Sequence, residues 1–377
     1  MSERIYGISE RKCRWRETFC VDPPAKTSAT KMKQSIFSNE KSNKPSSKGK
    51  GELPTAVSLF AGSGGMDVGF SKEGFDVVWA NDIDHWACET YKLNFGNHIV
   101  EADIADVDIK TIPKVDIILG GFPCQDFSMI WKRGGINTER GNLYRYFVKI
   151  IEAKQPKMFV AENVKGLLTA NGGKAVKQIV DDFTKTGYNV QLNKVNFADY
   201  GTPQLRERVL IIGTRKDLGK EFVMPSKTHT PDTYITAGQA LKGVESVPYN
   251  NEHQNIMPKT RELLKLIPPG GNFTDVPKDS PYYVRGMISH VYRRLHPDKP
   301  SKTIIAGGGG GTWGYHYKEL RPLTNRERAR LFGYPDDFMF VGSITEVRRQ
   351  IGNSVAPIGI QPIARAIKAY LRSVNVR

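Results

Sequence analysis

Residues 115–125 read Val115-Asp-Ile-Ile-Leu-Gly-Gly-Phe-Pro-Cys-Gln125, an apolar run that ends in a turn rich in glycine and proline. The run Val115–Leu119 is typical of a buried strand in a parallel sheet. In α/β proteins the turn directly after such a strand is a place where ligands bind. Cys124 therefore lies on a predicted ligand-facing turn. A small buried thiol is the alternative for this cysteine when it is considered alone.

Strand and helix patterns alternate from Thr55 to about residue 216. Besides Val115–Leu119, four apolar runs predict strands: Ala56–Phe60, Val77–Ala80, Met158–Ala161 and Val209–Ile212. Helical patterns lie between them, at Asp84–Asn94, Leu143–Ala153 and Ala175–Thr186. This alternation predicts an α/β fold with a doubly wound, mostly parallel sheet that carries helices on both faces. Residues 55–216 are therefore expected to form the first folded domain.

The rest of the chain divides into three further segments. Residues 1–54 are expected to form a basic, flexible arm, because residues 1–50 hold 12 Lys and Arg against 5 Asp and Glu. Residues 217–317 are rich in Pro, Gly, Asn and Tyr and weakly periodic, which predicts a second, smaller and irregular domain. Residues 318–377 hold two helical patterns, Thr324–Phe332 and Ala356–Val374, that are expected to return to the first domain.

The composition indicates a polyanionic partner. The formal net charge is +16, and cationic side chains bind nucleic acids by releasing phosphate counterions. An unspecific basic surface is the alternative, and charge alone does not distinguish DNA from RNA. The sequence has no membrane-spanning apolar run, no secretory signal and no Cys/His cluster. We therefore expect a cytoplasmic protein without a metal site.

A glycine-rich turn, Phe60-Ala-Gly62-Ser-Gly64-Gly65, follows the first predicted strand. Its glycines permit a tight turn and bring backbone N–H groups close to an anionic ligand group. Such a turn suits a nicotinamide dinucleotide, a flavin or S-adenosylmethionine. It lacks both the GxGxxG spacing and the Lys-Ser/Thr pair of a phosphate-binding loop. Because a methionine-derived cofactor needs no pyrophosphate cradle, the turn favours S-adenosylmethionine.

Carboxylates follow several of the predicted strands. Asp82 is placed to accept hydrogen bonds from ribose hydroxyls, although Asp82 or Asp84 is equally suited to cap a helix. Asp103 and Ile104 suit the amino group and the face of an adenine. Glu162 ends the fourth predicted strand, where burial favours a raised pKa and proton donation. A structural cap is the alternative for Glu162.

An alternating stretch, Gln204-Leu-Arg206-Glu-Arg208, leads into the last predicted strand. Alternation would direct Gln204, Arg206 and Arg208 to one face. Two guanidinium groups on that face would orient Glu162 and bind a phosphate or a base edge. A surface ladder with Glu207 is the alternative.

Taken together, these motifs resemble those of cytosine-5 DNA methyltransferases, over about residues 56–215 and 318–375. In that family's order the chain carries FAGSGG, GGFPCQDFS, ENV, QLRER, a segment from Arg321 to Asp336, and QIGNSV at 350–355. The resemblance implies the Rossmann-like fold of S-adenosylmethionine-dependent methyltransferases. It also implies that residues 217–317 are a target recognition domain that reads bases of double-stranded DNA in the major groove.

The resemblance further implies roles in catalysis. Cys124 matches the nucleophile that adds to carbon 6 of a flipped-out cytosine, which makes carbon 5 able to attack the methyl group. Glu162 matches the residue that protonates or hydrogen-bonds the ring nitrogen at position 3. Arg206 and Arg208 match the pair that holds the base carbonyl and the glutamate. Loss of the carbon 5 proton and elimination then free Cys124.

The same comparison implies a binding site for S-adenosylmethionine. The resemblance matches the glycine loop to Phe60, Gly62 and Gly64, and the ribose-binding acid with the residue after it to Asp82 and Ile83. It matches the adenine-side contacts to Asp103, Ile104 and Pro123, and the late closing segment to Asn353 and Ser354.

The function implied is DNA cytosine-5 methylation of the restriction–modification type, by a monomer in the bacterial cytoplasm that associates with the nucleoid through DNA. Two alternatives use the same scaffold: a transfer RNA cytosine methyltransferase and a catalytically silent DNA-binding homologue. The intact Cys124, Glu162 and arginines argue against a silent homologue. A nicotinamide oxidoreductase would leave Cys124 and the basic charge unexplained.

Overall fold

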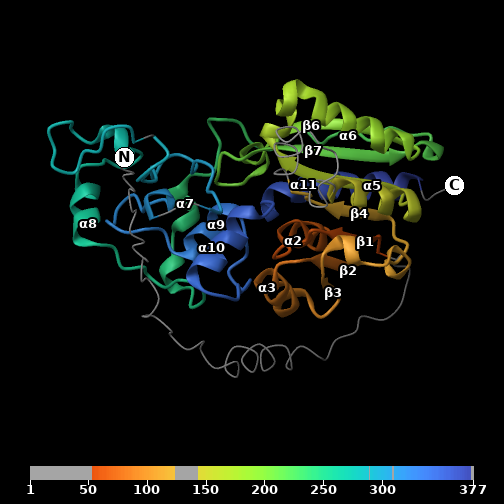
Figure 1. Ribbon diagram of the computed structural model, residues 1–377, viewed down its shortest axis with the longest axis horizontal. Coiled ribbons are helices and arrows are strands. Elements are labelled where there is room, and N and C mark those ends of the chain that lie inside the picture. Colours follow the sequence, from red (N-terminus) through yellow and green to blue (C-terminus); the bar gives the residue numbers. More distant parts are fainter. Residues whose placement is uncertain (1–52, 124–142, 288, 308–309, 375–377) are drawn as a thin grey trace, which may run out of the picture. The chain divides into compact units, whose positions relative to one another are not determined.

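The computed structural model describes residues 53–123, 143–287, 289–307 and 310–374. They contain one sheet with the strand order β3-β2-β1-β4-β5-β7-β6 (Figure 1). Strands β1 to β5 pair in parallel, and β7 pairs antiparallel with both β5 and β6. The strands are β1 (Thr55–Leu59), β2 (Asp76–Asp82), β3 (Ile99–Glu101), β4 (Ile117–Gly120), β5 (Met158–Val164), β6 (Tyr188–Asn196) and β7 (Glu207–Arg215).

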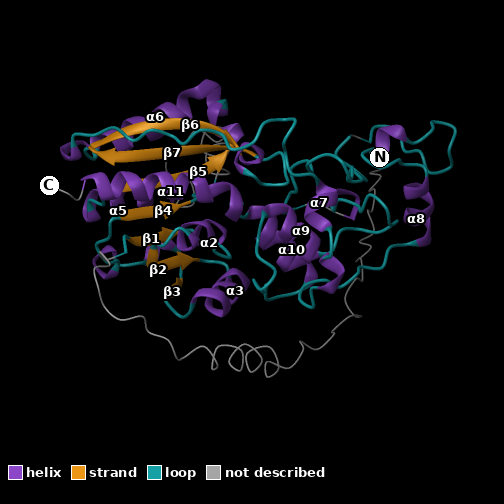
Figure 2. Ribbon diagram, turned by 180° about the vertical axis from the view of Figure 1, so that it is seen from behind, coloured by secondary structure: helices purple, strands orange, loops and turns teal. Residues whose placement is uncertain are grey.

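The sheet confirms the predicted α/β class with mostly parallel strands, and each of the five predicted strands is present with shifted ends. Two strands were not predicted. β3 has only three residues, too few for a pattern. β6 reads YNVQLNKVN and is half-exposed along much of its length, because it lies at the edge of the sheet (Figure 2). Apolar runs identify strands that are covered on both faces, and β6 is not one of them.

Helices cover both faces of the sheet (Figure 1). Helices α2 (Gly65–Lys72) and α11 (Pro357–Val374) share one apolar core with the sheet. Helices α5 (Leu143–Lys154) and α6 (Lys174–Lys185) share the other. Helix α3 (His85–Phe95) packs beside β2 and β3. The doubly wound arrangement predicted from the alternation is therefore confirmed.

Successive residues of the central strands alternate between these two cores. In β5, Met158 and Val160 contact the core of α2 and α11, whereas Phe159 and Ala161 contact the core of α5 and α6. All four side chains are fully buried. Because both faces are covered, the strand appears in the sequence as an unbroken apolar run rather than as an alternating one.

Between residues 217 and 317, the described residues form short helices and turns but no named strand, as the weak periodicity predicts. The helices are α7 (Ala237–Leu241) and α8 (Pro258–Lys265). Helix α9 (Asn325–Phe332) contacts α7 and α10 (Ile344–Asn353), the latter not predicted from the sequence. In the described part of the chain, we find no helix with the length and apolar character needed to span a membrane.

Gly69 is the residue that lets α2 approach α11. A β-carbon at this position would lie 2.2 Å from Ile360 Cγ2 and 2.8 Å from the carbonyl oxygen of Pro357. We predict that Gly69→Ala lowers the free energy of unfolding by about 1–3 kcal/mol, despite the higher helix propensity of alanine. Gly166→Ala is the control, because its β-carbon would meet only Val164 Cγ2 at 4.0 Å. Chemical denaturation measures both, and equal stability of the two variants would contradict the prediction.

Candidate active site

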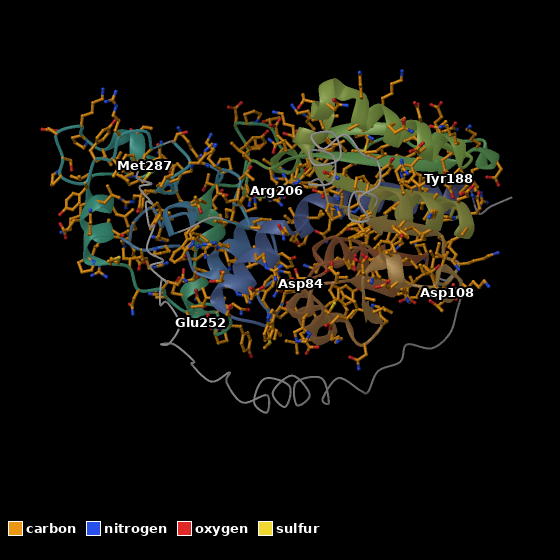
Figure 3. The ribbon with its side chains drawn as sticks, in the orientation of Figure 1. Asp84, Asp108, Tyr188, Arg206, Glu252 and Met287 are labelled. Carbon is orange, nitrogen blue, oxygen red and sulfur yellow. The ribbon has the colours of Figure 1, made fainter. Side chains whose placement is uncertain are left out.

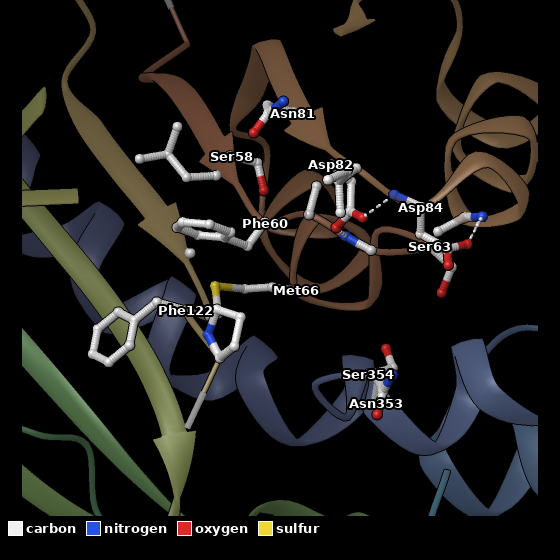
Figure 4. A pocket seen from close by; sticks show the side chains of 18 of the residues that line it. Ser58, Phe60, Ser63, Met66, Asn81, Asp82, Asp84, Phe122, Asn353 and Ser354 are labelled. Carbon is white, nitrogen blue, oxygen red and sulfur yellow. Dashed lines mark hydrogen bonds between the residues drawn. The ribbon is translucent and has the colours of Figure 1, made fainter. Parts of the chain in front are cut away.

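A cavity of about 610 Å³ lies at the carboxyl ends of β1, β2, β4 and β5, and the end of α10 forms one of its other walls (Figure 4). β1 pairs with β2 on one side and with β4 on the other, so the cavity lies where the strand order reverses, the usual ligand position in such sheets. Nine of the ten residues predicted to bind the cofactor line it: Phe60, Gly62, Asp82, Ile83, Asp103, Ile104, Pro123, Asn353 and Ser354.

The glycine loop turns sharply between β1 and α2. Phe60 and Gly62 have positive φ angles of 53° and 56°, and nothing lies within 4 Å of a β-carbon built at Gly62. Gly62 thus leaves open space at the cavity wall, where a ligand can approach the backbone closely. Gly64, the remaining predicted residue, does not line the cavity. A β-carbon there would lie 2.3 Å from Phe95 Cε2, so Gly64 serves the packing of the loop on α3.

Asp82 connects the glycine loop with the end of β2. Its carboxylate accepts hydrogen bonds from the backbone N–H groups of Gly62 (2.7 Å) and Asp84 (2.8 Å). Burial nevertheless raises its pKa. A carboxylate has about four acceptor positions, so Asp82 can still accept from a ligand in the cavity. Asp84 caps α3 through the N–H of Ala87 (2.9 Å), as one of the two sequence interpretations predicted.

Apolar residues supply a second group of contacts at the cavity. Ile83 is 67% exposed, whereas Ile104 is buried, and both line the cavity together with Pro123. Asp103 caps the short turn after β3 by accepting from Ala105 N–H (3.0 Å). Apolar side chains next to a few fixed polar groups are typical of small-molecule binding sites.

The wall formed by α10 is joined to the glycine loop by a hydroxyl chain. The Tyr334 hydroxyl hydrogen-bonds with Ser354 Oγ and with Ser63 Oγ, the latter at 3.3 Å. Burial raises the pKa of Tyr334 to about 12, so the phenol is neutral. Tyr334 was not among the predicted site residues, although it lies in the quoted segment that ends at Asp336. Its role arises from a contact that only the fold creates.

Glu162 and Arg208 form a buried ion pair at the edge of the cavity. Arg208 Nε lies 2.8 Å from Glu162 Oε1, and each side chain is only 11% exposed. Burial raises the pKa of Glu162, while the positive charges of Arg208 and then Arg206 oppose the rise. The pair arises because β7 is antiparallel to β5, so its first residues lie beside the last residues of β5. Glu162 is therefore both desolvated and fixed in orientation.

Strand β7 itself holds only the last of Gln204, Arg206 and Arg208. β7 begins only at Glu207, so the alternation of a strand does not extend to the two earlier residues. Arg206 is 1% exposed, and its guanidinium donates to the backbone carbonyl groups of Ile304, Gly352 and Ser354. Its described hydrogen bonds thus fasten segments of the chain to one another. Arg208 forms an ion pair with Glu162, and the charge of Arg206 also acts on that carboxylate.

Asn163 holds the turn that precedes the predicted nucleophile. Its side-chain Nδ2 donates to the carbonyl oxygen of Phe122 (3.0 Å), and its Oδ1 accepts from the N–H of Val164 (2.8 Å). The turn that leads to Pro123 is thereby fixed beside β5. Cys124 itself lies outside the described residues, so its position stays a prediction.

A second cleft of about 680 Å³ lies next to the ion pair. Arg208 lines this cleft, whereas its partner Glu162 lines the first cavity. Cationic side chains from separate parts of the chain also line it: Lys165, Arg293 and Lys302. Glu207, which pairs with Lys165 (2.7 Å), lines the cleft as well, but the cations outnumber it and favour a polyanionic ligand. The ion pair therefore stands between the first cavity and a basic cleft.

Comparisons with known proteins agree with this arrangement. Residues 55–369 match the family model described as C-5 cytosine-specific DNA methylase. The Type II methyltransferase M.NgoFVII of Neisseria gonorrhoeae is 58% identical over 340 residues, which are 88% of this chain and 90% of that protein. The Type II methyltransferase M.BbvI of Brevibacillus brevis is 41% identical over 341 residues, 83% and 91% of the two chains.

A solved structure shares the fold. It is described as a DNA modification methyltransferase encoded within a prophage (E. coli), and it superimposes with a TM-score of 0.68. The alignment covers 85% of this chain and 99% of that one, with 24% sequence identity. At that identity the likeness concerns the fold alone.

Asp67 of α2 is fully buried and accepts a hydrogen bond from Ser58 Oγ (2.7 Å). Burial raises its pKa from 3.8 to about 6, so the folded state holds this proton more tightly than the unfolded state does. The wild type should therefore lose stability as the pH rises through 3.8 to 6. Relative to Asp67→Asn, the loss should reach about 3 kcal/mol at pH 8.

Denaturant unfolding of the wild type and of Asp67→Asn, from pH 4 to pH 8, measures this difference. Asparagine keeps an acceptor for Ser58 but does not ionise, so its curve should be flatter. Parallel curves for the two proteins would contradict the prediction.

Proposed function

The chain belongs to the C-5 cytosine-specific DNA methylase family and is a DNA cytosine-5 methyltransferase, and on this premise we propose which groups carry out the transfer. S-adenosylmethionine is the proposed methyl donor, Cys124 the nucleophile, and Glu162 with Arg208 the pair that activates the base. The observation that carries the proposal is the buried ion pair of Glu162 and Arg208, which stands between the first cavity and the basic cleft. The relatives do not favour an RNA methyltransferase or a silent homologue.

The first cavity suits S-adenosylmethionine, which supplies an electrophilic methyl group on a sulfonium sulfur. Its volume of about 610 Å³ is within the usual range for a ligand of this size. We propose that the remaining acceptor positions of Asp82 bind the ribose hydroxyls. The open backbone at Gly62 would receive the methionine end, and Ile83, Ile104 and Pro123 would enclose the adenine. Asn353 and Ser354 would complete the site.

The target base is proposed to enter from the basic cleft. A cytosine inside a duplex is inaccessible, so it must be flipped out of the helix. Lys165, Arg293 and Lys302 would hold the phosphates by charge. Arg208 lines the cleft and would donate to the carbonyl oxygen of the base while it orients Glu162.

Activation of the base follows from these positions. The thiolate of Cys124 adds to carbon 6, and Glu162 gives a proton or a hydrogen bond to the ring nitrogen at position 3. Carbon 5 then takes the methyl carbon as the bond between that carbon and the sulfonium sulfur breaks, which leaves S-adenosylhomocysteine. Loss of the carbon 5 proton to a base such as water, return of any transferred nitrogen 3 proton to Glu162, and cleavage of the bond between Cys124 and carbon 6 restore the aromatic ring. A raised pKa of Glu162 suits this role, because the protonated form is the donor.

The biological role proposed is protection of DNA against a cognate restriction enzyme. It is supported by the similarity to two Type II methyltransferases from bacteria. We further propose that the protein acts as a monomer, in the bacterial cytoplasm and at the nucleoid.

Incubation with labelled S-adenosylmethionine tests the activity, with plasmid DNA and transfer RNA as separate substrates. The wild type should label the DNA, and Cys124→Ser should lower the rate by at least about a thousandfold, because an alcohol is a far weaker nucleophile than a thiolate. Cys88→Ser is the matched control, since Cys88 is a buried free thiol outside the proposed chemistry.

Bisulfite sequencing of the labelled plasmid would then identify the methylated cytosine and the sequence around it. Label in transfer RNA alone would favour the RNA alternative. Equal label from the wild type and from Cys124→Ser would overturn the role of the thiol.

The pH dependence of kcat tests Glu162. Because burial raises its pKa, the protonated donor should disappear as the pH rises through that value, and kcat should fall with it. Glu162→Gln keeps an N–H donor that does not titrate, so it should be slower by about 10²–10⁴-fold and should lack this limb of the profile. If kcat of Glu162→Gln falls with rising pH as that of the wild type does, a group other than Glu162 causes the fall.

A further inference from the structure

Arg206, which is labelled in Figure 3, hydrogen-bonds with two other segments of the chain, at Ile304 and at Gly352 and Ser354. We propose that Arg206 is a positioning residue, which holds the α10 wall of the first cavity and the lining of the basic cleft in a fixed relation without touching a ligand. This inference rests on the proposed function, because it assigns the cofactor to the cavity and DNA to the cleft. It departs from the base-binding role that the sequence motif implies for Arg206.

On the cavity side, Arg206 holds the end of α10. Its Nη2 donates to the carbonyl oxygens of Gly352 (2.9 Å) and Ser354 (2.8 Å). These two residues flank Asn353, and both Asn353 and Ser354 line the cavity. The guanidinium therefore fixes the backbone that would complete the cofactor site.

On the cleft side, Arg206 and its neighbours hold residues 301–304. Arg206 Nη1 donates to the carbonyl oxygen of Ile304 (3.3 Å), and Ile304 N–H donates to the side chain of Gln204 (3.2 Å). Thr303 Oγ1 donates to the carbonyl oxygen of Leu205 (2.6 Å). Because Leu205, Thr303 and Ile304 line the basic cleft, the same contacts fix the wall that would face DNA.

The junction has little free space. A β-carbon at Gly352 would lie 2.3 Å from Ala306 Cα and 2.4 Å from Ala306 N, so the end of α10 lies directly against the segment after Ile304. The Arg206 guanidinium also lies 4.6 Å from the centre of the Phe332 ring. A displacement of either wall must therefore displace the other, since close-packed elements do not deform independently.

Burial of a cation at this point is energetically unfavourable in itself, and it lowers the pKa of Arg206. Its described hydrogen-bond acceptors are three backbone carbonyl groups. A planar guanidinium with five donors can reach acceptors in several directions, whereas a lysine ammonium is a point charge on a flexible chain. Lysine therefore keeps the charge but not the geometry.

Arg206→Lys tests the proposal, with Arg326→Lys as a matched control. Arg326 is also fully buried and also donates to three carbonyl oxygens, those of Tyr249, Pro335 and Phe338. None of these residues lines the cavity or the cleft. Both variants should lower the Tm, because both lose buried hydrogen bonds.

Only Arg206→Lys should bind both ligands more weakly than the wild type does. We expect its Kd for S-adenosylhomocysteine, measured by calorimetry, and its KM for plasmid DNA to rise about tenfold each. Arg326→Lys should keep both values within about twofold. Wild-type affinity for S-adenosylhomocysteine or a wild-type KM for DNA in folded Arg206→Lys would overturn the proposal, as would equal losses in Arg326→Lys.

Amide hydrogen exchange of the wild type gives a second measurement that needs no variant. Saturating S-adenosylhomocysteine should slow exchange in residues 301–306, although none of them lines the first cavity. Unchanged exchange there would overturn the proposal. A wild type that fails to methylate plasmid DNA would count against the proposed function instead, and the exchange and calorimetry would still decide the role of Arg206.

Discussion

The parallel pairing of β1 with β2 on one side and with β4 on the other is the constraint on which the site depends. Parallel strands bring their carboxyl ends to one edge of the sheet, and the reversal of strand order separates the turns that follow them. The glycine loop, Asp82 and the turn of Gly121–Pro123 therefore surround one cavity, although they are far apart in sequence. A binding site built in this way takes its residues from separate segments of the chain.

Buried charge is stabilised differently at each part of the site. The carboxylate of Asp82 accepts from two backbone N–H groups, that of Glu162 pairs with Arg208, and Arg206 donates to three carbonyl oxygens. Removal of one partner leaves an unpaired charge in a region of low dielectric constant, which is strongly destabilising. The groups are therefore held in position before a ligand arrives, and preorganised dipoles and charges are what favour a charged transition state.

Much of this arrangement could be predicted from the sequence, because the cavity residues follow apolar strands whose ends the parallel pairing fixes. The prediction failed where a contact depends on distant segments. β7 starts at Glu207, and just before it Gln204 and Leu205 hydrogen-bond with residues 301–304. The contact of Tyr334 with Ser354 likewise has no signal in the local sequence. The same holds for the strand β6. The position of Cys124 is not tested by the described residues.

The packing of α11 on α2 has a consequence for the synthesis of the protein. Helix α11 ends at Val374 and supplies much of the apolar core that covers one face of the sheet, against residues such as Met66 and Phe70. A nascent chain that has emerged only as far as β7 lacks both this cover and the α10 wall of the cavity. Because domains fold as units, the sheet is covered and the cavity is complete only after residues 344–374 have been synthesised. A chain that stops before α11 therefore exposes the apolar face of the sheet that this helix covers.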